Sequence, residues 1–566
     1  MNFRKPCRAE CHKAFAPAPR FVPLNRRGRL SPDRTARICF FIVFLALPVS
    51  AQNVAPKFRV AGKVVSAVTG RPVAGAELLF GRADDFEATQ QKLLTADDGA
   101  FAFTVAEPGK CTLNGQAYGF RSQGFEQHGV YVSAIVVGKN LNTENIVFRL
   151  RPDARLMGVV EDEDHEAIGS ATVYLFHTDV SLGLKLTSLV QQVTTDDRGR
   201  YRFAHLEPGD YYVVVSASPW FSGLLQQTDA AQSAALSQKP EFDVTYSTTF
   251  YPGVTDVASA SQISLNDGAD FTADFTLSPV PALRVVVDDA NPDGEQPPNV
   301  ALHQKIFNAT ITQPWLRHVV SNDSVEIRGV PPGAYVLDIP SLGNKTSNRS
   351  MRLALSEDAE FDAESASAVA PIRGVVRTQA GVLPKGQVNV FLWNSRAGEL
   401  LDSSMNEKGE VNFDNDFLVP GTYSVYAMSG PNSIVSSLKA TGARVAGQTV
   451  EITGGKAVQL EIEMASTLSK ITGTVQRDGK PVLGAMILLV PEEAEINLPK
   501  FRRDQSDSDG TFTLVDVLPG HYRILAIENG WNQEWANASL LTQWLEHAQK
   551  IDVQGNQSYH TVLELE

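Results

Sequence analysis

The sequence repeats one pair of landmarks at a nearly constant distance. Each copy begins with an apolar segment that carries a glycine, and it later reaches a Pro-Gly pair that leads into another apolar segment. The glycines are Gly62, Gly158, Gly374 and Gly473, and the prolines are Pro108, Pro208, Pro420 and Pro519. The distance from glycine to proline is 46, 50, 46 and 46 residues. Unrelated sequence does not preserve such a spacing, so the chain is predicted to consist of tandem structural units.

A fifth, degenerate copy lies between the second and third clear copies. Its Pro-Gly pair begins at Pro332, and the position 46 residues upstream is Val286, inside the apolar run 283–287. This copy lacks both the strand glycine and the acidic glycine turn that the others carry, as in 197–199 and 509–510. We therefore expect five units.

Within each copy, apolar and polar residues alternate between glycine-rich turns, as in 201–203 and 511–514. Such a period of two is typical of half-buried antiparallel strands, and the glycines supply the positive φ angles of tight hairpins. About seven short strands per copy predict a Greek-key-like sandwich. The expected fold is all-β, a linear array of about five Greek-key-like, roughly seven-stranded β-sandwich modules. One helix is expected near 538–549, where Leu541, Trp544 and Leu545 share one face.

The landmarks divide the chain into six parts. The expected parts are a signal peptide at 1–51, module 1 at 57–150, module 2 with a long insertion at 154–279, a degenerate module 3 at 281–365, module 4 at 370–465, and module 5 with a short helix at 468–566.

The signal peptide is predicted from an arginine-rich stretch, the apolar run 38–47 and the small residues that end at Ala51. About ten apolar residues are too few for a spanning helix, which needs about 20. We expect a secreted, periplasmic or cell-surface protein without membrane insertion after signal cleavage. Cys111 is the one cysteine outside the signal, so no disulfide within the mature chain is expected.

The motifs resemble those of the carboxypeptidase regulatory-like domain, a prealbumin-like β-sandwich. In copy two they are Gly-x-Val at 158–160, an alternating strand at 171–175, the acidic glycine turn at 196–203 and Leu-x-Pro-Gly-x-Tyr at 206–211. Copy five matches equally well. The resemblance covers nearly all of the chain after residue 51, and it implies tandem structural or binding modules of an exported bacterial protein. It names no ligand.

Motifs for catalysis are missing from the sequence. The peptidase after which the family is named needs His-x-x-Glu, but none of the ten histidines has Glu three residues later. No nucleophile elbow, phosphate-binding loop or zinc-spaced cysteine pair occurs. The acidic segment 161–166 and the group Asp504, Asp507 and Asp509 are interpreted as solvated turns, because calcium needs six to eight converging oxygens. We expect no catalytic residues, no metal site and no cofactor.

Charge and aromatic residues suggest which partners fit. Residues 52–566 hold 40 Lys or Arg and 62 Asp or Glu, so a nucleic acid is not an expected partner. Trp531, Trp535 and Trp220 are candidate ligand-binding residues, because a flat ring can stack on a sugar; core packing is the alternative for each.

Three functions fit the sequence. The favoured one is a non-catalytic secreted scaffold or interaction protein whose partner is an extracellular protein or a polysaccharide. The others are a carbohydrate-binding module array and an enzyme whose site lies on the 123–145 or 218–250 insertion. The sequence does not indicate the oligomeric state.

Overall fold

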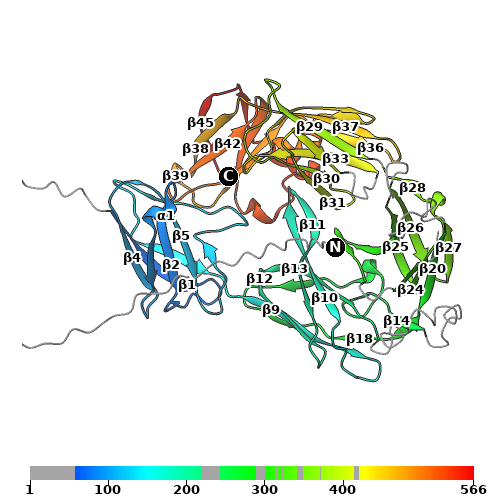
Figure 1. The fold of residues 1–566 in the computed structure, drawn as a ribbon. Coiled ribbons are helices and arrows are strands. Elements are labelled where there is room, and N and C mark those ends of the chain that lie inside the picture. The colour runs from blue at the N-terminus through cyan, green and yellow to red at the C-terminus, as the bar shows by residue number, and fades with distance from the viewer. Residues whose placement is uncertain are drawn as a thin grey trace, which may run out of the picture. The chain divides into compact units, whose positions relative to one another are not determined.

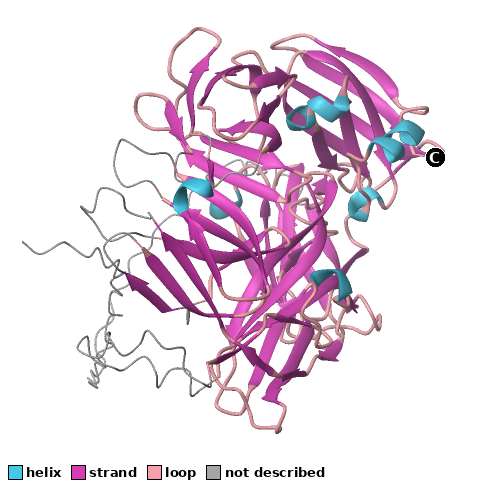
Figure 2. Cartoon of the chain, turned by 90° about the vertical axis from the view of Figure 1, so that its right-hand side faces the viewer, coloured by secondary structure: helices cyan, strands magenta, loops and turns pink. Residues whose placement is uncertain are grey.

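The computed structural model describes residues 58–219, 243–288, 300–313, 317–320, 324–340, 348–369, 371–413 and 420–565. The predicted signal peptide and Trp220 lie outside these ranges. Strands dominate the described chain, and the helices are few and short (Figure 2). None of the described helices has the length and apolar character needed to cross a bilayer. The residues from Pro56 onward form one compact unit.

The sheets fall into five groups along the chain, which we number modules 1 to 5 (Figure 1). In module 1, one sheet has the order β4 (Ala100–Val105), β1 (Phe58–Ser66) and β8 (Ile146–Leu150). The other contains β3 (Gln91–Leu94), β2 (Glu77–Arg82), β5 (Gly109–Gln116) and β6 (Gln123–Gly124), and β7 (Ile135–Val137) also pairs with β5. The short helix α1 (Phe86–Thr89) follows β2.

Module 2 has one sheet of β12 (Arg200–Leu206), β9 (Ala154–Asp162) and β17 (Asp270–Thr272), with β18 (Phe275–Leu277) also on β9. Its second sheet contains β11 (Leu184–Thr194), β10 (Thr172–Ser181), β13 (Gly209–Ser216) and β15 (Thr249–Phe250), with β16 (Ile263–Leu265) also on β13. A separate ribbon pairs β14 (Val244–Tyr246) with β19 (Pro279–Pro281).

Module 3 has one sheet of β23 (Arg317–Val320), β24 (Val325–Val330), β20 (Leu283–Asp288) and β27 (Ala359–Asp362). Its second sheet contains β22 (Ala309–Ile311), β21 (Ala301–Ile306), β25 (Gly333–Ile339), β26 (Arg349–Leu355) and β28 (Ser367–Ala368).

Module 4 has one sheet of β32 (Glu410–Asn412), β29 (Ile372–Thr378), β37 (Val458–Met464) and β34 (Val435–Thr441). Its second sheet contains β31 (Glu399–Ser404), β30 (Asn389–Asn394), β33 (Gly421–Met428), β36 (Thr449–Ile452) and β35 (Arg444–Ala446).

Module 5 has one sheet of β39 (Lys480–Pro481), β38 (Ser469–Arg477) and β42 (Thr511–Val517), with β45 (Ser558–Glu564) also on β38. Its second sheet contains β41 (Arg502–Gln505), β40 (Met486–Pro491), β43 (Gly520–Ile527) and β44 (Gln549–Val553). The helix α2 (Ala538–Trp544) is shorter than the predicted segment, because Gln549 already pairs with Ile524 as the first residue of β44.

All five modules share the same central strand pairings. The first strand pairs antiparallel with the strand that precedes the Pro-Gly turn, and it pairs parallel with a strand near the end of the module, as β1 does with β4 and β8. The same two partnerships recur for β9, β20, β29 and β38. In the facing sheet, the second strand always pairs with the strand that follows the Pro-Gly turn. The spacing of the landmarks is therefore the chain distance between two fixed strands of one repeated sandwich, and the all-β fold class is confirmed.

The strand glycine is explained by the close approach of the last strand. A Cβ on Gly62 would lie 1.9 Å from the Ile146 carbonyl oxygen, and one on Gly158 would lie 1.9 Å from that of Ala273. The corresponding distance for Gly473 is 2.2 Å, to the Thr561 oxygen. A side chain would separate the two parallel strands, so glycine is required where they meet.

Each module has its own apolar core between its two sheets. Two further apolar clusters lie outside these cores. One joins modules 2 and 3, where Phe307 contacts the rings of Phe176 and Tyr212. The other covers the outer face of the β40–β43 sheet and includes Trp535 and Leu541. As a result every residue of β40 is buried, because its two faces pack against different clusters.

Contacts connect module 5 with the module that precedes it in the sequence and also with a module that is not consecutive with it. Module 5 contacts module 4, since Arg502 donates a hydrogen bond to the Ser433 carbonyl at 2.6 Å. It also contacts module 2, since the amide of Ala536 donates to the Gly183 carbonyl at 2.9 Å. The modules follow one another linearly along the chain, but their contacts go beyond that order. These additional junctions could not be predicted from the repeat.

Candidate functional site

Trp535, a predicted ligand-binding residue, lies in the outer cluster of module 5. It is 5% exposed and packs against Phe501, with ring centroids 5.4 Å apart. The guanidinium of Arg503 lies 4.3 Å from its ring centroid, as in a cation–π contact. This position indicates packing rather than a ring presented to a ligand.

Trp531, the second candidate, lies where module 5 meets module 1. Its ring stacks on His128 at 5.1 Å with an interplanar angle of 9°, and the Tyr131 ring lies 5.2 Å away. Its indole N–H donates to the Gly484 carbonyl at 3.2 Å. The structure thus brings Trp531 and Trp535 into one apolar cluster, in which both rings contact other side chains of the protein. Trp220 lies outside the described residues, so its role as a ligand-binding residue stays a prediction.

Polar bonds surround this stack and join modules 1 and 5. The Gln505 side-chain amide donates to the Glu126 carbonyl at 2.5 Å and to Ser133 Oγ at 2.7 Å. The Ser133 hydroxyl in turn donates to the Ser506 carbonyl at 2.8 Å. Gln505, Ser506 and Ser133 are buried, so each bond is made away from water and its loss would leave an unpaired polar group.

The acidic turn of module 5 takes part in the same interface. Asp507 accepts a hydrogen bond from the Ala134 amide at 2.6 Å and pairs with Lys110. The Ser508 hydroxyl accepts from the Val136 amide at 2.8 Å. Burial raises the pKa of Asp507, and Lys110 opposes that effect. The interpretation of this group as a solvated turn was wrong for Asp507, since its carboxylate is bonded to module 1.

Asp504 is half-buried, and partial burial raises the pKa of its carboxyl to about 6 although it accepts from the Thr513 amide. The other acidic segment, 161–166, is a turn in which Asp162 accepts from the amides of Asp164 and Glu166. Among the described residues, no group of three His, Cys, Asp or Glu side chains is arranged to hold a metal ion.

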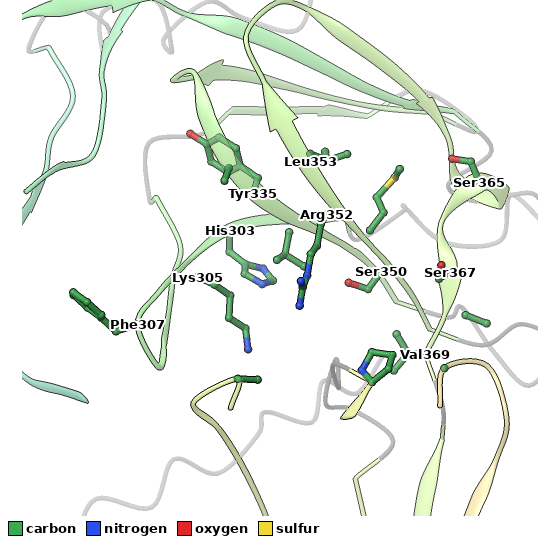
Figure 3. A pocket seen from close by; sticks show the side chains of 17 residues that line it. His303, Lys305, Phe307, Tyr335, Ser350, Arg352, Leu353, Ser365, Ser367 and Val369 are labelled. Atoms are coloured by element: carbon green, nitrogen blue, oxygen red, sulfur yellow. The ribbon is translucent and has the colours of Figure 1, made fainter. Parts of the chain in front are cut away.

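A pocket of about 870 Å³ lies between modules 3 and 4. His303 and Lys305 on β21 and Arg352 on β26 direct their nitrogen atoms toward its centre (Figure 3). The Ser350 hydroxyl lies beside Arg352, and Ser367 lies further along the pocket (Figure 3). Module 4 contributes Ala397, Pro420 and Gly454 to the lining. His303, Lys305 and Arg352 were not predicted from the sequence, because they belong to no motif and lie in the degenerate third copy.

Two buried carboxylates, Asp338 and Glu399, pair with basic side chains of this pocket. Asp338 lies 3.2 Å from His303 Nδ1 and accepts from the Ser350 hydroxyl at 2.7 Å. Burial lowers the pKa of His303 to about 4 and raises that of Asp338 to about 6. At pH 7 the pair is therefore a neutral imidazole beside an ionised carboxylate.

Lys305 crosses to module 4 and pairs with Glu399 at 2.9 Å. Glu399 is 4% exposed and also accepts from the Tyr423 hydroxyl. Burial and the neighbouring Glu399 raise the pKa of Tyr423 far above its usual value, so its phenol remains a donor. The pair holds the Lys305 amine at the pocket wall and joins the two modules.

Comparison with known proteins identifies one module directly. Residues 155–278 match the family model of the carboxypeptidase regulatory-like domain. This segment contains most of module 2, so module 2 is similar to that domain. The other four modules share the central strand pairings of module 2, as the repeated landmarks indicated.

Several solved structures show weak similarity to this chain. The Bacillus anthracis TIE protein is 12% identical, with 91% of this chain and 76% of that chain covered and a TM-score of 0.16. The streptococcal ancillary pilin is 11% identical, with 54% and 98% covered and a TM-score of 0.19. The minor pilin GBS52 of Streptococcus agalactiae is 13% identical, with 40% and 97% covered and a TM-score of 0.20. No curated protein matches the sequence.

Proposed function

We propose that the chain is a non-catalytic scaffold of carboxypeptidase regulatory-like modules that is exported to the periplasm or the cell surface. The observation that carries this proposal is that module 5 is bonded to modules 1, 2 and 4. Buried polar side chains such as Gln505 and Arg502 are committed to these junctions. Sandwiches held in fixed positions can present a partner-binding surface of constant geometry, which a flexible string of modules cannot do.

Small-angle X-ray scattering of residues 52–566 tests the scaffold. The expected curve is that of one rigid body, with a bell-shaped Kratky plot that does not change between low and moderate salt. A curve that only an ensemble of independently moving modules can fit would refute the proposal.

Export is tested by fractionation of the source cells with an antibody against the mature chain. We expect signal in the periplasmic, surface or culture fraction, and retention in the cytoplasm would contradict export.

A further inference from the structure

The pocket between modules 3 and 4 has a charge that is opposite to that of the chain. The full sequence has 64 acidic and 50 basic residues, yet the residues that line the pocket include His303, Lys305 and Arg352 and no Asp or Glu. We propose that this pocket binds a small hydroxylated molecule that carries an oxyanion, either a carboxylate or a phosphate. This inference goes beyond the proposed scaffold and does not depend on it.

Arg352 supplies the charge that is available to a ligand. It is exposed, and within the described chain its side chain forms no hydrogen bond or ion pair. Figure 3 shows its guanidinium beside the His303 ring, facing the amine of Lys305 across the pocket. The guanidinium is permanently charged, and its planar N–H groups match two oxygens of a carboxylate or phosphate.

Lys305 adds a second cation that is already positioned. Glu399 occupies one side of its amine at 2.9 Å, and an ammonium has three N–H donors, so further donors remain for a ligand. The compensating carboxylates, Glu399 and Asp338, are each nearly excluded from solvent. An oxyanion that enters the pocket therefore meets the two cations before it meets the carboxylates, and the attraction is strengthened by the partly dry surroundings.

His303 and the serines favour a ligand that also has hydroxyl groups. Because His303 is neutral at pH 7 and its Nδ1 faces the Asp338 carboxylate, the proton stays on Nδ1 and Nε2 is left as an acceptor. A hydroxyl can donate to that nitrogen, whereas an oxyanion cannot. Ser350 and Ser367 add hydroxyl groups at the pocket. A volume of about 870 Å³ suits a molecule the size of a mono- or disaccharide.

Isothermal titration calorimetry with three matched sugars tests the proposal. Glucose, glucuronate and glucose 6-phosphate are titrated into residues 52–566 at pH 7 and low salt. We expect at least one of the two charged sugars to bind ten-fold or more tightly than glucose, with an affinity that falls as salt is added. Preference for glucuronate would identify a carboxylate ligand and preference for the phosphate ester a phosphate ligand. Equal affinity for all three sugars, or no binding of any, would overturn the proposal.

Arg352→Gln is the variant that locates the binding. Since Arg352 is exposed and unbonded within the described chain, the variant should keep the wild-type melting temperature while its affinity for the charged sugar falls at least ten-fold. Lys305→Gln is less suitable, because it would leave Glu399 buried without its cation. Arg198→Gln, in an exposed turn of module 2, is the matched control and should bind as the wild type does. Unchanged affinity of the Arg352 variant would show that the sugar binds elsewhere and would overturn the assignment.

Discussion

At Gly62, Gly158 and Gly473, the missing side chain lets a carbonyl oxygen of the last strand approach the first strand at a distance that no Cβ tolerates. These residues were recognised from the sequence as markers of a repeat, but the spacing alone did not say why glycine was needed. The structure provides the reason, which is the parallel pairing of two strands that are more than 80 residues apart, such as Gly62 with Ile146. Modules 3 and 4 differ: Val286 stands at this position in module 3 and pairs with Glu360 of β27, and a Cβ on Gly374 of module 4 would lie 3.5 Å from the Leu460 oxygen.

A methyl group at Gly62 should therefore destabilise module 1. We expect Gly62→Ala to cost about 1–3 kcal/mol, because β8 must shift away from β1 or the backbone must distort. Gly138→Ala in the same module is the control, since its Cβ would meet nothing closer than Leu141 at 3.4 Å. Thermal denaturation followed by circular dichroism compares the two variants. Equal melting temperatures would show that the strands separate without cost.

At the scale of elements, the outer face of the β40–β43 sheet is covered by the segment that contains Trp531, Trp535 and α2. Trp535→Ala should cost about 3–5 kcal/mol, because it leaves a large cavity beside Phe501. Trp531→Ala should cost less, because this ring is only partly buried and contacts module 1 rather than the middle of the cluster. Calorimetric melting of both variants checks the order. Two unchanged melting curves would contradict packing and would favour a sugar-binding role for the pair.

Much of the element order could be predicted from the sequence, because alternation, acidic glycine turns and Pro-Gly pairs are local signals. The run 486–490, for example, is apolar throughout and lies within β40. Its burial on both faces was not predictable, since a short apolar run looks the same whether one face or two faces are covered. The pocket residues His303 and Arg352 were missed for a related reason, because isolated basic residues on alternating strands are usually solvated.

At the scale of the whole molecule, the junctions between modules arise from residues that no repeat marks. Ser133 and Ser506 are 373 positions apart and lie in a loop and a turn, where polar residues are expected for any sandwich. Their role depends on the contact between modules 1 and 5, and nothing local in the sequence indicates which modules contact each other. The likeness among modules is thus encoded locally, whereas their assembly depends on polar groups that face one another after folding.

Hydrogen–deuterium exchange on residues 52–566 can test the meeting of modules 1 and 5 directly. The Ala134 amide donates to the Asp507 carboxylate at 2.6 Å, and a bond to a charged acceptor is worth about 1.5–3 kcal/mol. Asp507→Ala should therefore raise the exchange rate of peptides that cover 131–137 by about ten-fold or more, although the substitution lies in another module.

Asp509→Ala is the matched control, because Asp509 belongs to the same turn but bonds to Thr511 within it. Its effect should stay within module 5. If the exchange of 131–137 were the same in the Asp507 variant and in the wild type, modules 1 and 5 would not be in contact in solution. In that case the rigid scaffold would lose its principal support.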